Sequence, residues 1–138
     1  MRDAIRFPLA RKVVLVTGAG GGLGSSLAEA LVERGAHVAL IDIDEAAAAR
    51  AAAALPDSQA CVAHGDVTDP GSMHAAVAQT IERFGRLDVA IANAGILGRA
   101  ATLRTTSPME IERVMSVNVS GAVNTVAFRD GRMIGHNT

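Results

Sequence analysis

A glycine-rich stretch directly follows a short run of apolar residues near the start of the chain. Residues 13–16 read Val-Val-Leu-Val, which is typical of a buried β-strand because most of them are β-branched. After the glycines, Leu23, Leu27 and Leu31 recur at every fourth residue, which predicts one face of a helix. A strand, a glycine turn and a helix in this order can bind a phosphate. The glycines let the backbone approach an anion, and the helix N-terminus offers unpaired N–H groups.

The spacing of the glycines separates several kinds of nucleotide-binding turn. The pattern G-x-G-x-x-G does not fit, because counting from Gly18 its last position is Leu23. The pattern T-G-x-x-x-G-x-G fits, with Thr17, Gly18, Gly22 and Gly24. No Gly-Lys-Ser or Gly-Lys-Thr follows, which excludes a P-loop. On this stretch alone, a plain tight turn and a methyltransferase-type turn stay open.

Length and composition exclude several classes of protein. A chain of 138 residues with 49% apolar residues is expected to form one domain with its own core. The net charge of −1 and the 2% aromatic content argue against a nucleic-acid partner. Cys61 and the four histidines lack metal-ligand spacing, so no metal is expected. Neither a signal peptide nor a run of ~20 apolar residues is found, so we expect no membrane partner and a cytoplasmic location.

Strand and helix signals alternate along the chain. Strands are expected at 12–17, 37–41, 59–63 and 87–92, and helices at 22–34 and 45–54. Asp69-Pro70 opens a further helix that Gly85 ends, and Ser107-Pro108-Met109-Glu110 opens a last helix with a capping box. Residues 1–11 are expected to form a loose arm, and residues 129–138 a polar tail. The alternation predicts an α/β protein with a parallel sheet.

Short motifs at the ends of these strands resemble, in order and spacing, those of the short-chain dehydrogenase/reductase family. The motifs are Thr17-Gly18 with Gly22-Leu23-Gly24, then Asp42, Asp66-Val67 and Asn93-Ala94-Gly95, and finally Asn118 in the last helix. The resemblance covers residues 11 to 128. It implies a Rossmann-type, doubly wound parallel sheet of order 3-2-1-4, with residues 12–128 forming the NAD(P)-binding domain.

The resemblance implies a cofactor role for residues that follow the first three strands. The glycines would allow the approach of the pyrophosphate. Asp42, with Ile43 beside it, would accept both ribose hydroxyls of adenosine and repel a 2′-phosphate, which indicates NAD rather than NADP. Asp66 would accept from the adenine amino group, and Val67 would pack on the ring. The alternatives are that Asp42 only caps the alanine-rich helix and that Asp66 only forms a turn.

Two further motifs take their meaning from the same resemblance. Asn93-Ala94-Gly95 would form the turn beside the cofactor, and the alternative is an ordinary Asn-Gly-rich turn. Asn118 would kink the last helix and hold a water in the proton relay, and the alternative is an Asn that only faces solvent. The helix spanning Ser107–Phe128 would pair with another subunit in a homo-oligomer.

The family's chemistry needs a Ser, and a Tyr followed by a Lys four residues later. This sequence contains no tyrosine, and its one lysine is Lys12. We therefore expect the nucleotide-binding half of a truncated NAD(P)-dependent oxidoreductase, acting on alcohols or carbonyls by family but inactive as written. The alternative from another class is a non-catalytic nucleotide-binding or oligomerisation module. Asp66-Val67 and Asn93-Ala94-Gly95 argue against a methyltransferase.

Overall fold

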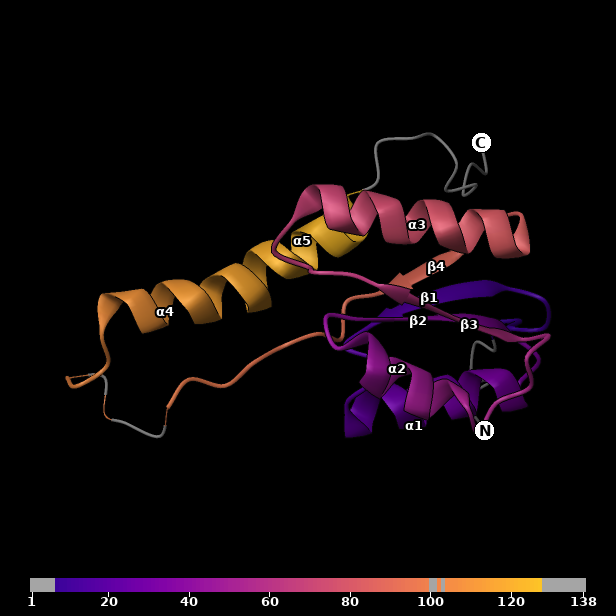
Figure 1. The fold of residues 1–138 in the computed structure, drawn as a ribbon, viewed down its shortest axis with the longest axis horizontal. Coiled ribbons are helices and arrows are strands. Elements are labelled where there is room, and N and C mark those ends of the chain that lie inside the picture. The colour runs from indigo at the N-terminus through magenta and orange to yellow at the C-terminus, as the bar shows by residue number, and fades with distance from the viewer. Residues whose placement is uncertain (1–6, 100–101, 103, 128–138) are drawn as a thin grey trace, which may run out of the picture.

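A parallel sheet forms the centre of the molecule in this computed structural model, which describes residues 7–99, 102 and 104–127 (Figure 1). Its strands are β1 (Val13–Thr17), β2 (His37–Asp42), β3 (Ala60–His64) and β4 (Val89–Ile91). The order is β3-β2-β1-β4, and Val14 of β1 lies opposite Val38 of β2 and Val89 of β4. This topology confirms the predicted Rossmann-type sheet.

Helices cover both faces of the sheet. On one face lie α1 (Gly22–Glu33) and α2 (Glu45–Ala52), and on the other lie α3 (Pro70–Phe84) and α5 (Gly121–Val126) (Figure 1). The remaining helix, α4 (Pro108–Met115), extends away from the sheet beyond the ends of the strands (Figure 1). Connections that place helices on both faces make the sheet doubly wound, as predicted.

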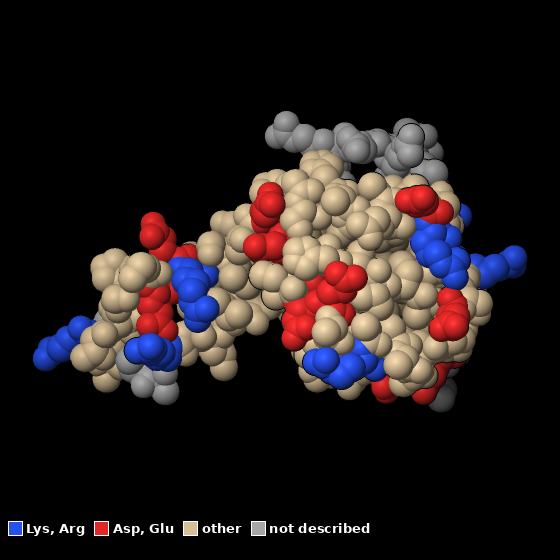
Figure 2. Space-filling model, viewed as in Figure 1, with Lys and Arg blue, Asp and Glu red and all other residues tan. Residues whose placement is uncertain are grey.

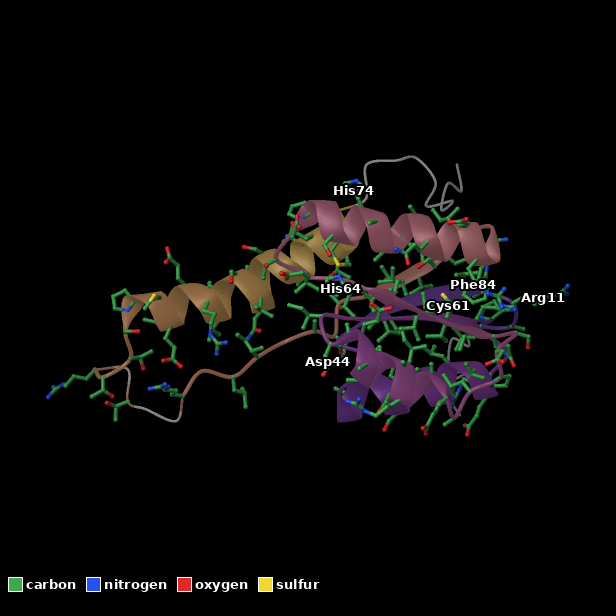
Figure 3. All side chains as sticks on the ribbon, in the orientation of Figure 1. Arg11, Asp44, Cys61, His64, His74 and Phe84 are labelled. Carbon is green, nitrogen blue, oxygen red and sulfur yellow. The ribbon has the colours of Figure 1, made fainter. Side chains whose placement is uncertain are left out.

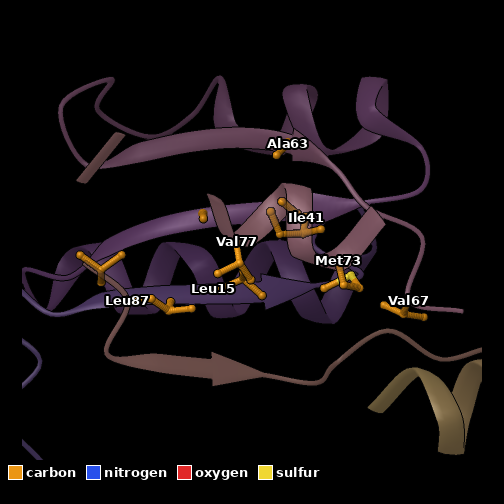
Figure 4. Close-up of a cluster of buried hydrophobic side chains, with 10 residues drawn as sticks. Leu15, Ile41, Ala63, Val67, Met73, Val77 and Leu87 are labelled. Carbon is orange, nitrogen blue, oxygen red and sulfur yellow. The ribbon is translucent and has the colours of Figure 1, made fainter. Parts of the chain in front are cut away.

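The central strands are buried on both faces, so their side chains divide between two cores. In β1, Val13 and Leu15 pack toward α3, whereas Val14 and Val16 pack toward α1 and α2, and all four are at most 2% exposed. Figure 4 shows the core on the α3 side, which includes Met73. Full burial of one such aliphatic side chain contributes roughly 1.5–3 kcal/mol.

Side-chain caps and glycines lie at the ends of the helices. Asp44, Asp69 and Ser107 each accept a hydrogen bond from a backbone N–H two or three residues further on, at the starts of α2, α3 and α4. Gly35 and Gly85 follow α1 and α3 with φ of +84° and +81°, a backbone conformation that glycine adopts at little cost. These side chains and glycines explain where the helices begin and end.

Two elements differ from the predicted ones. The last strand, Val89–Ile91, is shorter than the expected 87–92, because Leu87 forms only an isolated bridge before it and Asn93 turns toward β1 after it. The last helix was expected as one element with a kink at Asn118, but the structure divides it, because a π-helical turn at Ser116–Ser120 separates α4 from α5. This turn is centred on Asn118, whose side chain bonds to a neighbouring loop.

The predicted terminal segments lie mostly outside the described residues. Of the predicted arm at 1–11, the structure describes residues 7–11, which contain no helix or strand. Arg11 donates its backbone N–H to the Gly35 carbonyl over 2.8 Å, which attaches this segment to the end of α1. The predicted tail at 129–138 lies entirely outside the described residues.

Candidate nucleotide site

A cavity of about 710 Å³ opens at the carboxyl ends of the four strands. Its walls are the glycine turn after β1, residues 42–44 at the end of β2, residues 65–67 after β3 and residues 93–96 after β4, with Ala47, Arg113 and Val117 from the helices. In a doubly wound sheet, this edge is where a ligand binds. The volume lies within the usual range for a small-molecule site, about 300–1,000 Å³.

The glycine turn presents the open N-terminus of α1 to the cavity. No side chain caps this helix, and its first turn contains no acidic residue. Gly21 donates its N–H to Gly18, and Ser25 donates its N–H to Gly21, whereas the N–H groups of Gly22 and Leu23 have no acceptor among the described residues. Unpaired N–H groups and the positive end of the helix dipole together bind an anion.

The three motif glycines meet different physical demands. Gly18 has a φ of +65°, and a Cβ there would lie 2.8 Å from the Ala94 Cα. A Cβ on Gly24 would collide with the Gly18 carbonyl oxygen. A Cβ on Gly22 would meet nothing within 4 Å, so protein packing does not require this glycine. The space beside Gly22 is open to a ligand.

Asp42 fixes the backbone on both sides of the cavity mouth. Its Oδ2 accepts from the Gly20 N–H over 2.8 Å, and its Oδ1 accepts from the Asp44 N–H over 2.9 Å. The cap of α2 is Asp44, which accepts from the Ala47 N–H over 3.0 Å. Asp42 is therefore not the cap of this helix. A carboxylate oxygen has a second lone pair, so Asp42 can still accept from a ligand hydroxyl.

The wall after β3 contains Asp66 and Val67. The Oδ1 of Asp66 accepts from the N–H and the hydroxyl of Thr68 over 2.9 and 2.7 Å, so Asp66 does form the turn of the alternative interpretation. It also lines the cavity, together with Val67. The two interpretations of Asp66 are thus compatible. Ile43, 64% exposed, lines the neighbouring wall after β2.

Asn93 and Thr17 join the ends of β1 and β4. The Nδ2 of Asn93 donates to the carbonyls of Thr17 and Gly18 over 3.0 and 3.3 Å. The Thr17 hydroxyl accepts from the N–H groups of Asn93 and Ala94, each over 3.2 Å. Thr17 is only 1% exposed and does not line the cavity, whereas Asn93, Ala94 and Gly95 do. The structure therefore places Thr17 beneath the site, where it supports the glycine turn.

Asn118 attaches the loop after β4 to the last helix. Its Oδ1 accepts from the Ile96 N–H over 2.8 Å, and its Nδ2 donates to the Ile96 carbonyl over 2.9 Å. Ile96 lines the cavity, and so does Val117, which precedes Asn118 in the π-helical turn. Such turns are frequent at functional sites. Asn118 itself holds the wall rather than lining it.

Several residues of the cavity carry no sequence signal that identified them. Ala47 lies so close to the glycine turn that a Cβ on Gly20 would be 2.6 Å from its own Cβ. Arg113 lines the cavity from α4 and is the one cation among the described lining residues. Its position depends on the path of α4, which no local pattern specifies. Gly20 also lines the cavity, and its place inside the glycine run could have identified it as a site residue.

Charge is distributed unevenly around the cavity. Figure 2 shows acidic side chains where the body of the molecule meets the α4 arm, and the cavity there is lined by Asp42, Asp44 and Asp66. In Figure 3, Asp44 lies at this edge, and Cys61, Phe84 and Arg11 lie toward the opposite edge. Within the described residues, no three His, Cys, Asp or Glu side chains gather as a metal site would require.

A family model described as short chain dehydrogenase matches residues 12–136. The chain belongs to this family. Levodione reductase of Leifsonia aquatica is 37% identical over 114 residues, which are 80% of this chain and 43% of that protein. Sorbitol dehydrogenase of Cereibacter sphaeroides is 38% identical over 112 residues, 81% of this chain and 43% of that protein. The chain thus spans less than half the length of these relatives.

Solved structures of family members have the same fold. A 3-ketoacyl-(acyl-carrier-protein) reductase from Brucella melitensis complexed with NADH matches with a TM-score of 0.81 and 34% identity, over 85% of this chain and 48% of that one. A short chain dehydrogenase/reductase from Burkholderia phymatum in complex with NAD matches with a TM-score of 0.81 and 31% identity, over 88% of this chain and 43% of that one. Both of these neighbours are complexes with a nicotinamide dinucleotide. In the described part of the chain, no helix has the length and apolarity needed to span a membrane.

Proposed function

We propose that this chain binds NAD in the cavity and forms the nucleotide-binding half of an oxidoreductase that interconverts alcohols and carbonyls. One observation carries the proposal: the uncapped N-terminus of α1 and the carboxylate of Asp42 line the same cavity. When NAD is bound, its nicotinamide ring donates or accepts the hydride. The residues of this chain bind and orient the dinucleotide.

Each part of the dinucleotide has a matching group in the cavity. The N–H groups of Gly22 and Leu23 suit the pyrophosphate, since no acidic side chain competes there. Asp42 suits the ribose hydroxyls of adenosine. Asp66 and Val67, on the next wall, suit the adenine amino group and the ring face. The adenine half of the cofactor is thus covered by residues of this chain.

The carboxylates favour NAD over NADP. Asp42 and Asp44 line the wall that would receive the adenosine ribose, and both repel a 2′-phosphate. Two unit charges 4 Å apart interact by ~1 kcal/mol in water and by ~4 kcal/mol near a protein surface. We therefore expect NAD to bind at least about fivefold more tightly than NADP.

Calorimetric titration with NAD, NADP and S-adenosylmethionine tests the ligand and the role of Asp42 together. The unmodified chain should prefer NAD, and Asp42→Asn and Asp42→Ala should narrow that preference. Asp57→Ala is the matched control, because Asp57 is an exposed aspartate outside the cavity. Equal dissociation constants for NAD and NADP would disprove the role of Asp42. Binding of S-adenosylmethionine instead of NAD would favour a methyltransferase.

We further propose that these 138 residues alone do not turn over an alcohol or a carbonyl. The sequence has no tyrosine, and the ammonium of its lysine, Lys12, lies 3.9 Å from Asp88, which precedes β4 at the other end of the sheet from the cavity. A positioned general acid or base is worth about 10²–10⁴ in rate. NADH formation above a protein-free blank, in a preparation free of host dehydrogenases, would contradict this proposal.

Exposed apolar side chains on the last helix favour a second role in assembly. Met109, Met115, Val119 and Val123 are between 49% and 77% exposed. We propose that the predicted helix at 107–128, described here to residue 127, pairs with a second copy. Light scattering after gel filtration should show a dimer or tetramer that Met115→Lys with Val119→Lys reduces to monomer. The control Glu112→Lys should leave the oligomer intact, and an unmodified chain that is monomeric would refute the pairing.

The cytoplasmic location stays a prediction.

A further inference from the structure

The cavity wall after β3 is held from two sides by neighbouring helices. The Asp66 N–H donates to the Ser72 hydroxyl of α3 over 2.9 Å. The Val67 carbonyl accepts from the Nδ2 of Asn124 of α5 over 2.9 Å. The backbone of Asp66 is therefore held by a hydrogen bond to α3, and the backbone of Val67 by a hydrogen bond from α5.

Close packing adds to the hydrogen bond from α5. A Cβ on Gly121 would lie 2.6 Å from the Val67 Cγ2, so α5 can lie this close only because residue 121 is glycine. Val67 is 8% exposed, and Asn124 is half-buried and does not line the cavity. Asn124 therefore contacts the wall from behind. Its amide leaves the ligand side of the wall free.

The same helical segment also holds the wall after β4. Asn118 of the π-helical turn bonds to the backbone of Ile96, and Asn124 of α5 bonds to the backbone of Val67. Two asparagine amides on one helical segment thus connect two walls of the cavity to the same segment. Rotation or displacement of α5 would move the β3 wall with it.

We propose that Asn124 is a positioning residue for the adenine end of the dinucleotide. By holding the Val67 carbonyl, it keeps Asp66 and Val67 where the adenine amino group and ring can meet them. This inference rests on the proposed function, which assigns the adenine to this wall. Loss of the amide should therefore weaken recognition of the base more than binding of the phosphates.

Titration with two dinucleotides tests this role. NAD carries the adenine amino group, and nicotinamide hypoxanthine dinucleotide lacks it but has the same pyrophosphate. The variants are Asn124→Asp, which keeps the shape but cannot donate, and Asn124→Ala. Val126→Ala is the control, since Val126 is an exposed residue of the same helix, α5. We expect both Asn124 variants to raise the Kd for NAD about tenfold, in line with one lost hydrogen bond. The preference for NAD over the hypoxanthine analogue should fall toward one.

The outcomes separate this inference from the proposed function. If the unmodified chain does not bind NAD, the proposed function fails, and the inference fails with it. If it binds NAD but the Asn124 variants weaken both dinucleotides equally, Asn124 has only a structural role and the inference is wrong. If the variants keep both Kd values within about twofold, the inference is also wrong. Should Asn124→Ala not fold, Asn124→Asp decides the result.

Discussion

Gly22 and Gly24 lie two residues apart at the start of α1, but only Gly24 is confined by its neighbours. A Cβ on Gly24 would meet Gly18 and Ala19, whereas a Cβ on Gly22 would enter open space. We expect Gly24→Ala to lower the free energy of unfolding by about 1–3 kcal/mol. Gly22→Ala should change it by less than about 1 kcal/mol. The methyl group added by Gly22→Ala should raise the Kd for NAD at least about tenfold, because it occupies the predicted anion position.

Urea unfolding and NAD titration of the two variants measure these effects. Each variant is the control for the other, because both add one methyl group to the same helical turn. A Gly22→Ala variant that binds NAD as tightly as the unmodified chain would show that the pyrophosphate does not lie at this helix end.

Cys61 provides a second prediction at the residue scale. Its burial against the core raises the pKa of the thiol to about 11, although the charge of Arg83 acts in the opposite direction. The thiolate is the reactive form, and at pH 8 a group with this pKa is ionised to only about 0.1%. We therefore expect the folded chain to react slowly with a chromogenic disulfide reagent at pH 8, and much faster in urea. Equal rates in both states would contradict the burial of this thiol.

The sequence predicted most residues of the cavity, for a simple topological reason. Asp42, Asp66 and Asn93 lie at or just after the carboxyl ends of parallel strands, and these ends meet at one edge of the sheet. Thr17 and Asn118 do not line the cavity: the Thr17 hydroxyl bonds to protein N–H groups beneath it, and Asn118 bonds to the backbone of Ile96. Arg113 could not be predicted, because its approach depends on the path of a helix far away in sequence.

At the scale of elements, β1 and β4 are joined at their amino ends by Asp88. Its carboxylate accepts from the Val13 N–H over 2.9 Å, and its own N–H donates to the Val13 carbonyl over 2.9 Å. Burial acts to raise the pKa of this carboxyl, but the Val13 hydrogen bond, the hydrogen bond and charge of Arg86 and the charge of Lys12 outweigh it and lower the pKa. The ionised form is thus stabilised in the folded state.

A lowered pKa makes this junction sensitive to acid. The stabilisation by Asp88 is complete above the pKa of an unfolded aspartate, about 3.9, and is lost as the pH falls through the lower folded value. Asp88→Asn should therefore lower the free energy of unfolding by about 1–3 kcal/mol at pH 7, and the difference should shrink below about pH 4. Urea unfolding from pH 3 to pH 7 checks this. The exposed Glu82→Gln is the control, and a deficit that does not depend on pH would exclude the charge as its cause.

The elements themselves were predicted well where the signals are local. Caps at Asp44, Asp69 and Ser107 and the glycines after α1 and α3 fix helix ends within a few residues. The family resemblance implied a kink at Asn118, but its form, a π-helical turn, depends on bonds to Ile96 across the cavity wall. Long-range bonds of this kind leave no periodic signal in a sequence.

For the whole molecule, binding of NAD should raise the melting temperature. A ligand that binds only the folded state stabilises it by about 2.7 kcal/mol at a concentration of 100 times its Kd. For a domain of this size, that corresponds to a shift of roughly 5–20 °C. Scanning fluorimetry with increasing NAD measures it. Gly22→Ala should show a smaller shift at the same concentration, and equal shifts with NAD and NADP would argue against the preference assigned to Asp42.

The global arrangement was predicted as far as the four strands extend. Parallel strands with helical connections have few topologies available, so order and layering follow from the alternation and the family motifs. The α4 arm was not predicted in this form, because its direction depends on contacts distant in sequence. Its apolar side chains are exposed in the described part of the chain, and their partner remains a matter of proposal.

The contact between Gly20 and Ala47 bears on how the alanine-rich helix α2 can drift in evolution. Residues 45–54 are almost all alanine, and from composition alone each position would be expected to tolerate substitution. The structure divides them: residues 46, 49 and 50 are exposed, whereas Ala47 lies against the glycine turn and Ala48 is buried. A lineage is free to vary the first group. Ala47, in contrast, lies against the turn at which we propose that the pyrophosphate binds, so we expect a larger side chain at residue 47 to disturb that turn and substitutions there to be rarer.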